Sequence, residues 1–223
     1  MIIFIHTTGM WRQKMARNKY PEQTVEKILE VSARLFLEKG YENTSLQDIL
    51  NELEGLTKGA IYHHFKSKED IFDAVATKMG EANGKYFIEM KNNTTLTGAQ
   101  KLKEVLVVSA FSEASNTIIG MMPSLLDNPK FLAIQMKANI NDVVPNYVFP
   151  IVEQGVNDGS INCDKPYELA ELITLLINTW LNPLILGDDK SRIANKCKLI
   201  NEILSVYNLV LFEDEIISKL ENL

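Results

Sequence analysis

Apolar residues recur at helical spacing along most of the chain, beginning near residue 24. The first run is made up of Val25, Ile28, Leu29, Leu35 and Phe36. These positions share one face of a helix, and Gly40 stands where a glycine often ends a helix by adopting a positive φ. The pattern predicts a helix that ends just before Gly40.

Two short helices are predicted next. The segment "TSLQ" at 44–47 matches a capping box, in which the Thr44 hydroxyl accepts from the amide of Gln47. The apolar pattern of "LQDILNEL" then predicts a short second helix. A glycine turn, "EGLT", follows, and Thr57 is placed to cap a third helix that reaches about Phe65.

The rest of the pattern is helical as well. Ser67 can cap a long fourth helix over 67–92, with Glu69 and Asp70 favourably placed in its first turn. Further helices are predicted at about 98–114, 117–126, 129–157, 165–186 and 190–210. Pro145 and Pro150 are expected to kink or break the third of these. No segment alternates convincingly at period two, so we predict an all-α fold of about nine or ten helices.

This pattern suggests three parts. Residues 1–14 lack periodicity and are expected to form a flexible leader, with Met15 resembling a second start. Residues 15–66 would form a first unit of three helices. Residues 67–223 would form a larger helical unit, with the helix over 67–92 linking the two.

Charge is unevenly distributed over the 223 residues. The net charge is −6, yet residues 1–70 contain ten Lys and Arg against ten Asp and Glu, so the acidic excess lies entirely beyond residue 70. The lysines of the first part cluster at Lys58, Lys66 and Lys68. If the chain meets a polyanion, this cluster is where the contact is expected.

The remaining composition excludes several classes. Cys163 and Cys197 show neither CxxC nor Cys/His spacing, which argues against a zinc site and favours a reducing, cytoplasmic setting. We expect no signal peptide, because the opening apolar run is short and lacks a preceding basic residue. We also expect no membrane contact, because the most apolar later run, 172–186, is too short and is interrupted by polar residues.

The short third helix carries the candidate chemistry. On a helical wheel Ile61 and Phe65 fall together, whereas Gly59, His63 and Lys66 fall on the opposite side. Eight residues span about 12 Å, close to the roughly 12 Å width of a B-DNA major groove. The apolar side can therefore pack on the neighbouring helices while the polar side faces a duplex.

Hydrogen-bond donors surround this helix. Lys58, Lys66, Lys68 and Tyr62 can reach phosphates from its flanks, and Ala60 adds a small edge for close approach. The start of the second helix, at Thr44 and Ser45, offers further amides. Taken singly, each residue also fits a surface or core role. A metal site at His63 and His64 is disfavoured, because adjacent helical residues diverge by about 100° and no third ligand lies nearby.

The segment "TVEKILEVSARLFLEKGYENTSLQDIL", followed by "LTKGAIYHHFKSKEDIF", resembles the DNA-binding domain of the TetR family of transcriptional regulators over residues 24–72. The strongest markers are "GY" at 40–41, "TSLQDI" at 44–49 and "KGAIYHHFKSKE" at 58–69. The turn before the third helix is one residue longer than the common family pattern. The resemblance implies DNA contacts for Thr44, Thr57, Lys58, Gly59, Tyr62, His63 and Lys68.

The resemblance implies that residues 15–66 form a helix-turn-helix DNA-binding domain. It also implies that residues 67–223 form an effector-binding and dimerisation domain, with an effector pocket and a dimer interface. The helix near 165–186 is apolar nearly all round, which favours burial against a second subunit, although an ordinary monomer core stays possible. Our candidate interface residues are Leu169, Leu172, Ile173, Leu176, Ile193, Cys197, Ile200 and Leu204. Our candidate pocket residues are Phe87, Met90, Phe111, Met121, Met122, Phe131, Met136, Tyr147 and Trp180. They suggest an apolar effector, and Glu113 and Asp142 would favour a cation if they faced inward.

The functional expectation is a homodimer that binds a palindromic, double-stranded DNA operator. A small molecule would release it, and a repressor is favoured over an activator. An enzyme is not expected, because GxSxG, Walker A, GxGxxG and HExxH motifs are missing from the sequence. No cofactor or metal is expected. The alternative is a helical interaction protein, or a regulator controlled by a protein partner.

Overall fold

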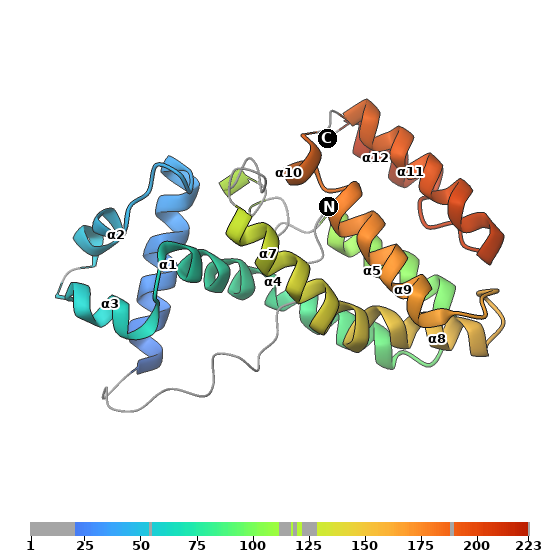
Figure 1. Ribbon diagram of the computed structural model, residues 1–223, viewed down its shortest axis with the longest axis horizontal. Helices are drawn as coiled ribbons and strands as arrows, with labels where there is room; N and C mark the ends of the chain where they lie inside the picture. The colour runs from blue at the N-terminus through green and yellow to red at the C-terminus, as the bar shows by residue number, and fades with distance from the viewer. Residues whose placement is uncertain are drawn as a thin grey trace.

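The computed structural model describes residues 21–53, 55–111, 117, 120–121, 129–187 and 190–222. Within these ranges all regular structure is helical, which agrees with the predicted all-α class (Figure 1). The predicted helix at about 117–126 and the leader at 1–14 lie largely outside the described residues. No helix in the described ranges combines the length and apolar character that a membrane span requires.

The first three helices form a group at one end of the molecule (Figure 1). They are α1 (Pro21–Lys39), α2 (Leu46–Glu52) and α3 (Lys58–His64). Gly40 ends α1 with φ 78° and Gly55 turns the chain between α2 and α3 with φ 79°. Both angles are in the left-handed region that favours glycine, so the predicted turns are confirmed.

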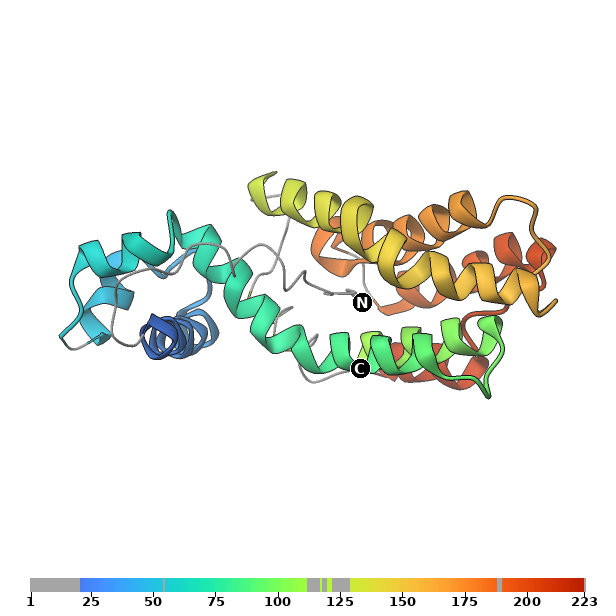
Figure 2. The ribbon, with the colours of Figure 1, turned by 90° about the horizontal axis from the view of Figure 1, so that it is seen from below.

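Helix α4 (Lys68–Asn92) runs from this group to the far end of the molecule (Figure 2). Ser67 caps it, since its hydroxyl accepts from the backbone N–H of Asp70. Glu69 and Asp70 occupy the first turn, where a carboxylate is favoured by the helix dipole. The predicted start and end of this helix are confirmed.

The C-terminal part continues with further helices. They are α5 (Gly98–Phe111), α7 (Pro129–Ala138), η1 (Asn139–Val148), α8 (Phe149–Asn157), α9 (Pro166–Leu175), η2 (Leu176–Trp180), α10 (Pro183–Leu186), α11 (Lys190–Leu204), η3 (Ser205–Tyr207) and α12 (Asp214–Asn222). The segments η1 and η2 are π-helical, and η3 is a short 3₁₀ helix. Helix α12, which packs beside α11, was not predicted.

The predicted 129–157 helix was expected to kink or break at its prolines, and it does not break. Helices α7, η1 and α8 follow one another without interruption and form one long curved rod (Figure 2). Pro145 lacks an N–H and cannot continue the α-helical ladder. The chain accommodates it by widening into η1, where the Phe149 N–H reaches back five residues to the Val144 carbonyl. The predicted 165–186 helix, in contrast, is interrupted after η2.

Two apolar cores hold the molecule together. The smaller core lies among α1, α2, α3 and the first half of α4, and it includes Phe36, Ile61 and Phe65. The larger core lies among the C-terminal helices and includes Phe87 from the second half of α4. Helix α4 therefore belongs to both cores, which places it between the predicted domains.

Helices α5 and α8 approach closely where α5 carries Gly98 and α8 carries Gly155. A Cβ added to Gly98 would lie less than 3.0 Å from backbone atoms of Gly155 and Ile151. Near this point the Lys101 side chain is buried, and its ammonium donates to the Lys91 carbonyl and to Gln154. These contacts fix the C-terminal end of α4 against α5 and α8.

Candidate DNA interface

Helix α3 is held by its apolar side. Ile61 and Phe65 are only 2% and 3% exposed, as the helical wheel predicted. Thr57 caps the helix, because its hydroxyl accepts from the Ala60 N–H at 3.3 Å. With one side anchored, the opposite side of α3, which carries Gly59 and His63, is exposed to solvent.

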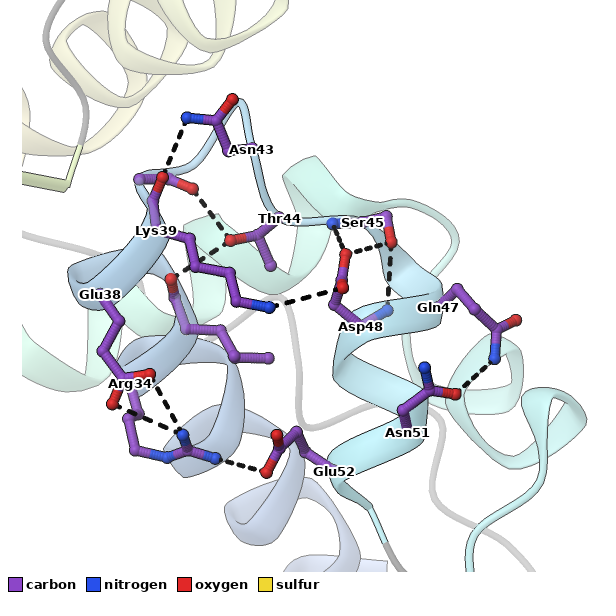
Figure 3. A network of polar contacts seen from close by, with 12 residues as sticks. Arg34, Glu38, Lys39, Asn43, Thr44, Ser45, Gln47, Asp48, Asn51 and Glu52 are labelled. Atoms are coloured by element: carbon purple, nitrogen blue, oxygen red, sulfur yellow. Dashed lines mark hydrogen bonds and ion pairs between the residues drawn. The ribbon is translucent and has the colours of Figure 1, made fainter.

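The start of α2 differs from the prediction by one residue. Ser45, not Thr44, is the N-cap, and it forms a capping box with Asp48 rather than with Gln47 (Figure 3). The Thr44 side chain is 1% exposed and its hydroxyl lies 2.9 Å from the Gly40 carbonyl. A hydroxyl that is buried and engaged in this way holds the turn after α1, whereas Ser45 is exposed.

Polar contacts lock α2 onto α1 (Figure 3). The Arg34 guanidinium donates to Glu52 at 2.9 Å and also contacts Glu38. Lys39 lies 3.5 Å from Asp48. These pairs are exposed and each contributes little energy; Arg34–Glu52 and Lys39–Asp48 connect α1 with α2 over the apolar core that the helices share.

Lys68 is turned toward the protein. Its ammonium donates to the Tyr41 carbonyl at 2.8 Å and lies 4.0 Å from the centre of the Tyr41 ring. Burial lowers the pKa of Lys68, although the carboxylates of Glu42 and Glu69 oppose this shift. The geometry assigns Lys68 to holding α4 against the turn after α1.

The candidate DNA-binding residues fall into an exposed group and a buried or partly buried group. Exposed side chains or backbone on this surface belong to Ser45, Thr57, Lys58, Gly59, Tyr62, His63 and Lys66. We call these residues the α3 surface. Ala60 and Lys68 are partly buried, and Thr44 is buried. The α3 surface thus combines two lysines, a phenol, hydroxyls and an imidazole, all of which can bind phosphates or base edges.

Gln47 was not among the residues predicted from the sequence for this surface. This exposed residue of α2 lines a shallow depression of about 60 Å³ together with Lys58 and Tyr62 of α3. Its side-chain amide donates to Asn51 at 2.8 Å. Gln47 lies opposite the buried Ile49 on the same short helix, and this polar position could have indicated from the sequence that Gln47 is exposed here.

The histidines form a pair at the end of α3. Their rings lie 5.1 Å apart in an edge-to-face arrangement. Burial, and then the charge of His63, lowers the pKa of His64, so His64 favours its neutral form. Within the described ranges no group of three His, Cys, Asp or Glu side chains is placed to hold a metal ion.

The candidate pocket residues do not all meet. Phe87 and Tyr147 form an edge-to-face pair with ring centres 6.1 Å apart, and Met90 packs on the same core. Met136 contacts Thr179, and the Lys196 ammonium lies over the Trp180 ring. Met121 instead packs in the smaller core with the N-terminal helices. The side chains of Phe111, Met122 and Phe131 lie outside the described residues.

The candidate dimer residues mostly serve the chain's own core. The buried ones are Leu169, Ile173, Cys197, Ile200 and Leu204. Leu172, Leu176 and Ile193 are partly buried against the same core. Burial raises the pKa of the Cys197 thiol to about 12. The exposed apolar side chains of this region are different ones, among them Leu199, Ile203 and Val206.

The fold and the α3 surface define a helix-turn-helix DNA-binding protein: a short capped helix is anchored by one side and presents donors on the other. A family model matches the N-terminal part. Residues 28–75 match the model of "Bacterial regulatory proteins, tetR family". This part of the chain, from α1 into α4, is therefore similar to that family of bacterial regulators.

Relatives match beyond this domain. The chain is 27% identical over 150 residues to the HTH-type transcriptional repressor KstR2 of Rhodococcus jostii, covering 64% of this chain and 70% of that protein. It is 26% identical over 157 residues to IcaR of Staphylococcus epidermidis, a negative transcriptional regulator of the biofilm operon icaADBC, covering 70% of this chain and 80% of that protein. With AcrR of Shigella flexneri it shares 36% identity over 96 residues, 42% of this chain and 44% of that protein.

A solved structure shares the fold. A TetR-family regulator from Pectobacterium atrosepticum superposes with a TM-score of 0.61 at 18% identity, covering 86% of this chain and 97% of that chain. At this identity the likeness concerns the fold alone.

Proposed function

We propose that this protein is a dimeric repressor that binds a palindromic operator through the α3 surface and is released by a small molecule. The observation that supports this most is the division of α3 into a buried apolar side and an exposed polar side. A recognition helix needs both, because it must be held rigidly while its outer side chains reach base edges. Relatives named as repressors favour the negative sign of control.

Dimerisation is supported by apolar side chains that the single chain leaves exposed. Leu199, Ile203, Val206 and Val210 are between 40% and 68% exposed along and just after α11. Leu199 and Ile203 stand four residues apart on α11 and form a stripe on one side of that helix, and the exposed Val206 in η3 and Val210 follow it along the chain. Leu175 of α9 is also exposed. A stripe of this kind is typical of a protein interface, and a two-fold dimer would bring two copies of it together.

The dimer can be tested directly. Leu199→Glu with Ile203→Glu places two carboxylates in the stripe without touching a buried residue. We expect the wild-type protein to sediment as a dimer and the variant as a folded monomer with unchanged helical circular dichroism. A variant that stays dimeric would place the interface elsewhere.

Operator binding is tested by capture of sheared genomic DNA from the source organism, followed by sequencing. We expect enrichment of fragments that share an inverted repeat. Tyr62→Ala with His63→Ala should abolish the enrichment and leave the thermal melt unchanged, because both side chains are exposed. If the wild-type protein enriches no sequence, the alternative of a helical interaction protein takes the place of the regulator.

A further inference from the structure

Buried polar side chains gather where the two π-helical segments meet. Asn139 and Asp142 lie on η1 and Asn178 lies on η2, and all three are at most 5% exposed. The Asn178 amide donates to the Asn139 side-chain oxygen at 2.8 Å, which joins the segments. π-Helical turns inside longer helices are frequent at functional sites. Because these buried groups are polar, apolar packing alone does not explain the cluster.

Asp142 is incompletely satisfied. One of its carboxylate oxygens accepts from the Asn146 amide at 2.8 Å. The other, Oδ2, is buried and has no hydrogen-bond partner among the described residues. None of the ion pairs found in those residues includes Asp142. A buried carboxylate oxygen without a donor is costly, so this position favours a donor from outside the chain.

Asn139 presents the complementary group. Its oxygen accepts from Asn178 and, at 3.4 Å, from Gln135. Its amide nitrogen, Nδ2, is buried without a partner in the described part of the chain. Asn139 and Asp142 are three residues apart on η1, within one π-helical turn. One unpaired donor and one unpaired acceptor thus belong to the same turn.

An aromatic pair begins on the same segment. Tyr147 stands about one π-helical turn after Asp142 on η1, and its ring meets Phe87 of α4. Burial and the charge of Asp142 raise the pKa of the Tyr147 phenol. A carboxylate flanked by aromatic rings is the surrounding that an organic cation prefers.

We propose that Asp142 and Asn139 form the polar end of the effector site and that the effector is a small organic cation carrying a polar oxygen. A protonated amine donates to Asp142 Oδ2, and a hydroxyl or carbonyl oxygen of the same molecule accepts from Asn139 Nδ2. The apolar body of the effector lies against Phe87 and Tyr147. This inference rests on the proposed function, since it names the chemistry of the molecule that releases the repressor.

The test uses the full chain without DNA and a panel of amines from ethanolamine to 2-amino-1-phenylethanol and tryptamine. Each amine is paired with the neutral alcohol of the same skeleton, such as 1-phenyl-1,2-ethanediol. Thermal unfolding and calorimetry measure binding. We expect amines with an aromatic body to bind and to raise Tm. Their alcohol partners should bind with an affinity at least roughly tenfold lower, the difference that a hydrogen bond to a charged group gives.

Two variants sharpen the result. Asp142→Asn keeps the shape and the contact with Asn146 but removes the charge, so it should abolish the preference for amines while the unliganded Tm stays equal or rises. Asp164→Asn, at an exposed position between α8 and α9, removes the same charge and should change neither. The wild-type comparison of amine with alcohol stands even if Asp142→Asn fails to fold.

Three results would overturn the proposal. The first is that no amine raises Tm, as expected if only water fills the site. The second is that alcohols bind as tightly as amines, as expected if the carboxylate does not recognise the ligand. The third is that Asp142→Asn lowers the unliganded Tm and keeps amine binding, as expected of a purely structural aspartate. DNA capture is measured on the same samples. Captured operator DNA without amine binding would refute the proposed cationic effector but not the proposed regulator function. Amine binding without captured DNA would refute the regulator function.

Discussion

The salt dependence of operator binding tests how the lysines divide their roles. Lys58 and Lys66 are exposed on the α3 surface, whereas the Lys68 ammonium is held by the Tyr41 carbonyl and ring. We therefore predict that Lys58 and Lys66 neutralise phosphates and that Lys68 does not. The perturbation is Lys58→Ala with Lys66→Ala, compared with Lys68→Met.

The magnitude follows from counterion release. Each phosphate neutralised contributes about 0.9 to the slope of log K against log salt. Two lysines in each of two subunits neutralise about four phosphates, so the double variant should lose about 3.6 from the slope. Between 50 and 200 mM salt, this difference corresponds to a factor on the order of 100 in relative affinity. Lys68→Met should leave the slope unchanged and lower stability by about 1 kcal/mol.

The assay is fluorescence anisotropy of a labelled operator, recovered by DNA capture, at several salt concentrations. Lys137→Ala with Lys198→Ala is the matched control, because it removes the same charge from exposed positions on the C-terminal helices. A slope that falls equally in the control would show that net charge, not contact, is responsible. A slope that falls by about 1.8 in Lys68→Met would refute the assignment of Lys68 to the turn.

Two further predictions concern stability. Thr44→Val removes a buried hydroxyl from the turn after α1 and should cost about 1–2 kcal/mol in urea unfolding, with an unchanged salt slope; a fall in slope would instead make Thr44 a phosphate contact. Gly98→Ala should cost about 3 kcal/mol or more, because its Cβ would overlap the backbone of α8. The control, Gly84→Ala within α4, meets nothing within 4 Å and should gain about 0.5–1 kcal/mol; equal effects at the two glycines would contradict the close approach of α5 and α8.

Local rules predicted the N-terminal helices well. Thr57, Ser67 and Gly40 act within one turn of their own position, so the short sequence around each contains the information that sets it. The same rule placed the cap of α2 at Thr44 because Thr44 and Ser45 both precede a side chain that can close a capping box. Only burial decides between them, and burial depends on where α1 lies.

Features that depend on contacts between distant parts of the chain could not be predicted from the sequence. Pro145 predicts the loss of a hydrogen bond but not whether the helix will end or widen, because the neighbouring helices decide which is cheaper. Helical periodicity likewise marks Leu169 and Cys197 as buried without saying which molecule covers them. The structure shows that the chain's own core covers them, and the exposed stripe that includes Leu199 is left for a partner.

Helix α4 connects the proposed cation site with the turn that precedes α2. Its second half places Phe87 against Tyr147, next to the proposed cation site, and its first residue is Lys68, which holds the Tyr41 carbonyl. The Tyr41 N–H in turn donates to the Met121 carbonyl at 3.1 Å. A ligand that shifts α4 therefore acts on the turn that precedes α2. Because coupling free energy is reciprocal, operator DNA must weaken amine binding by the same factor by which the amine weakens operator binding.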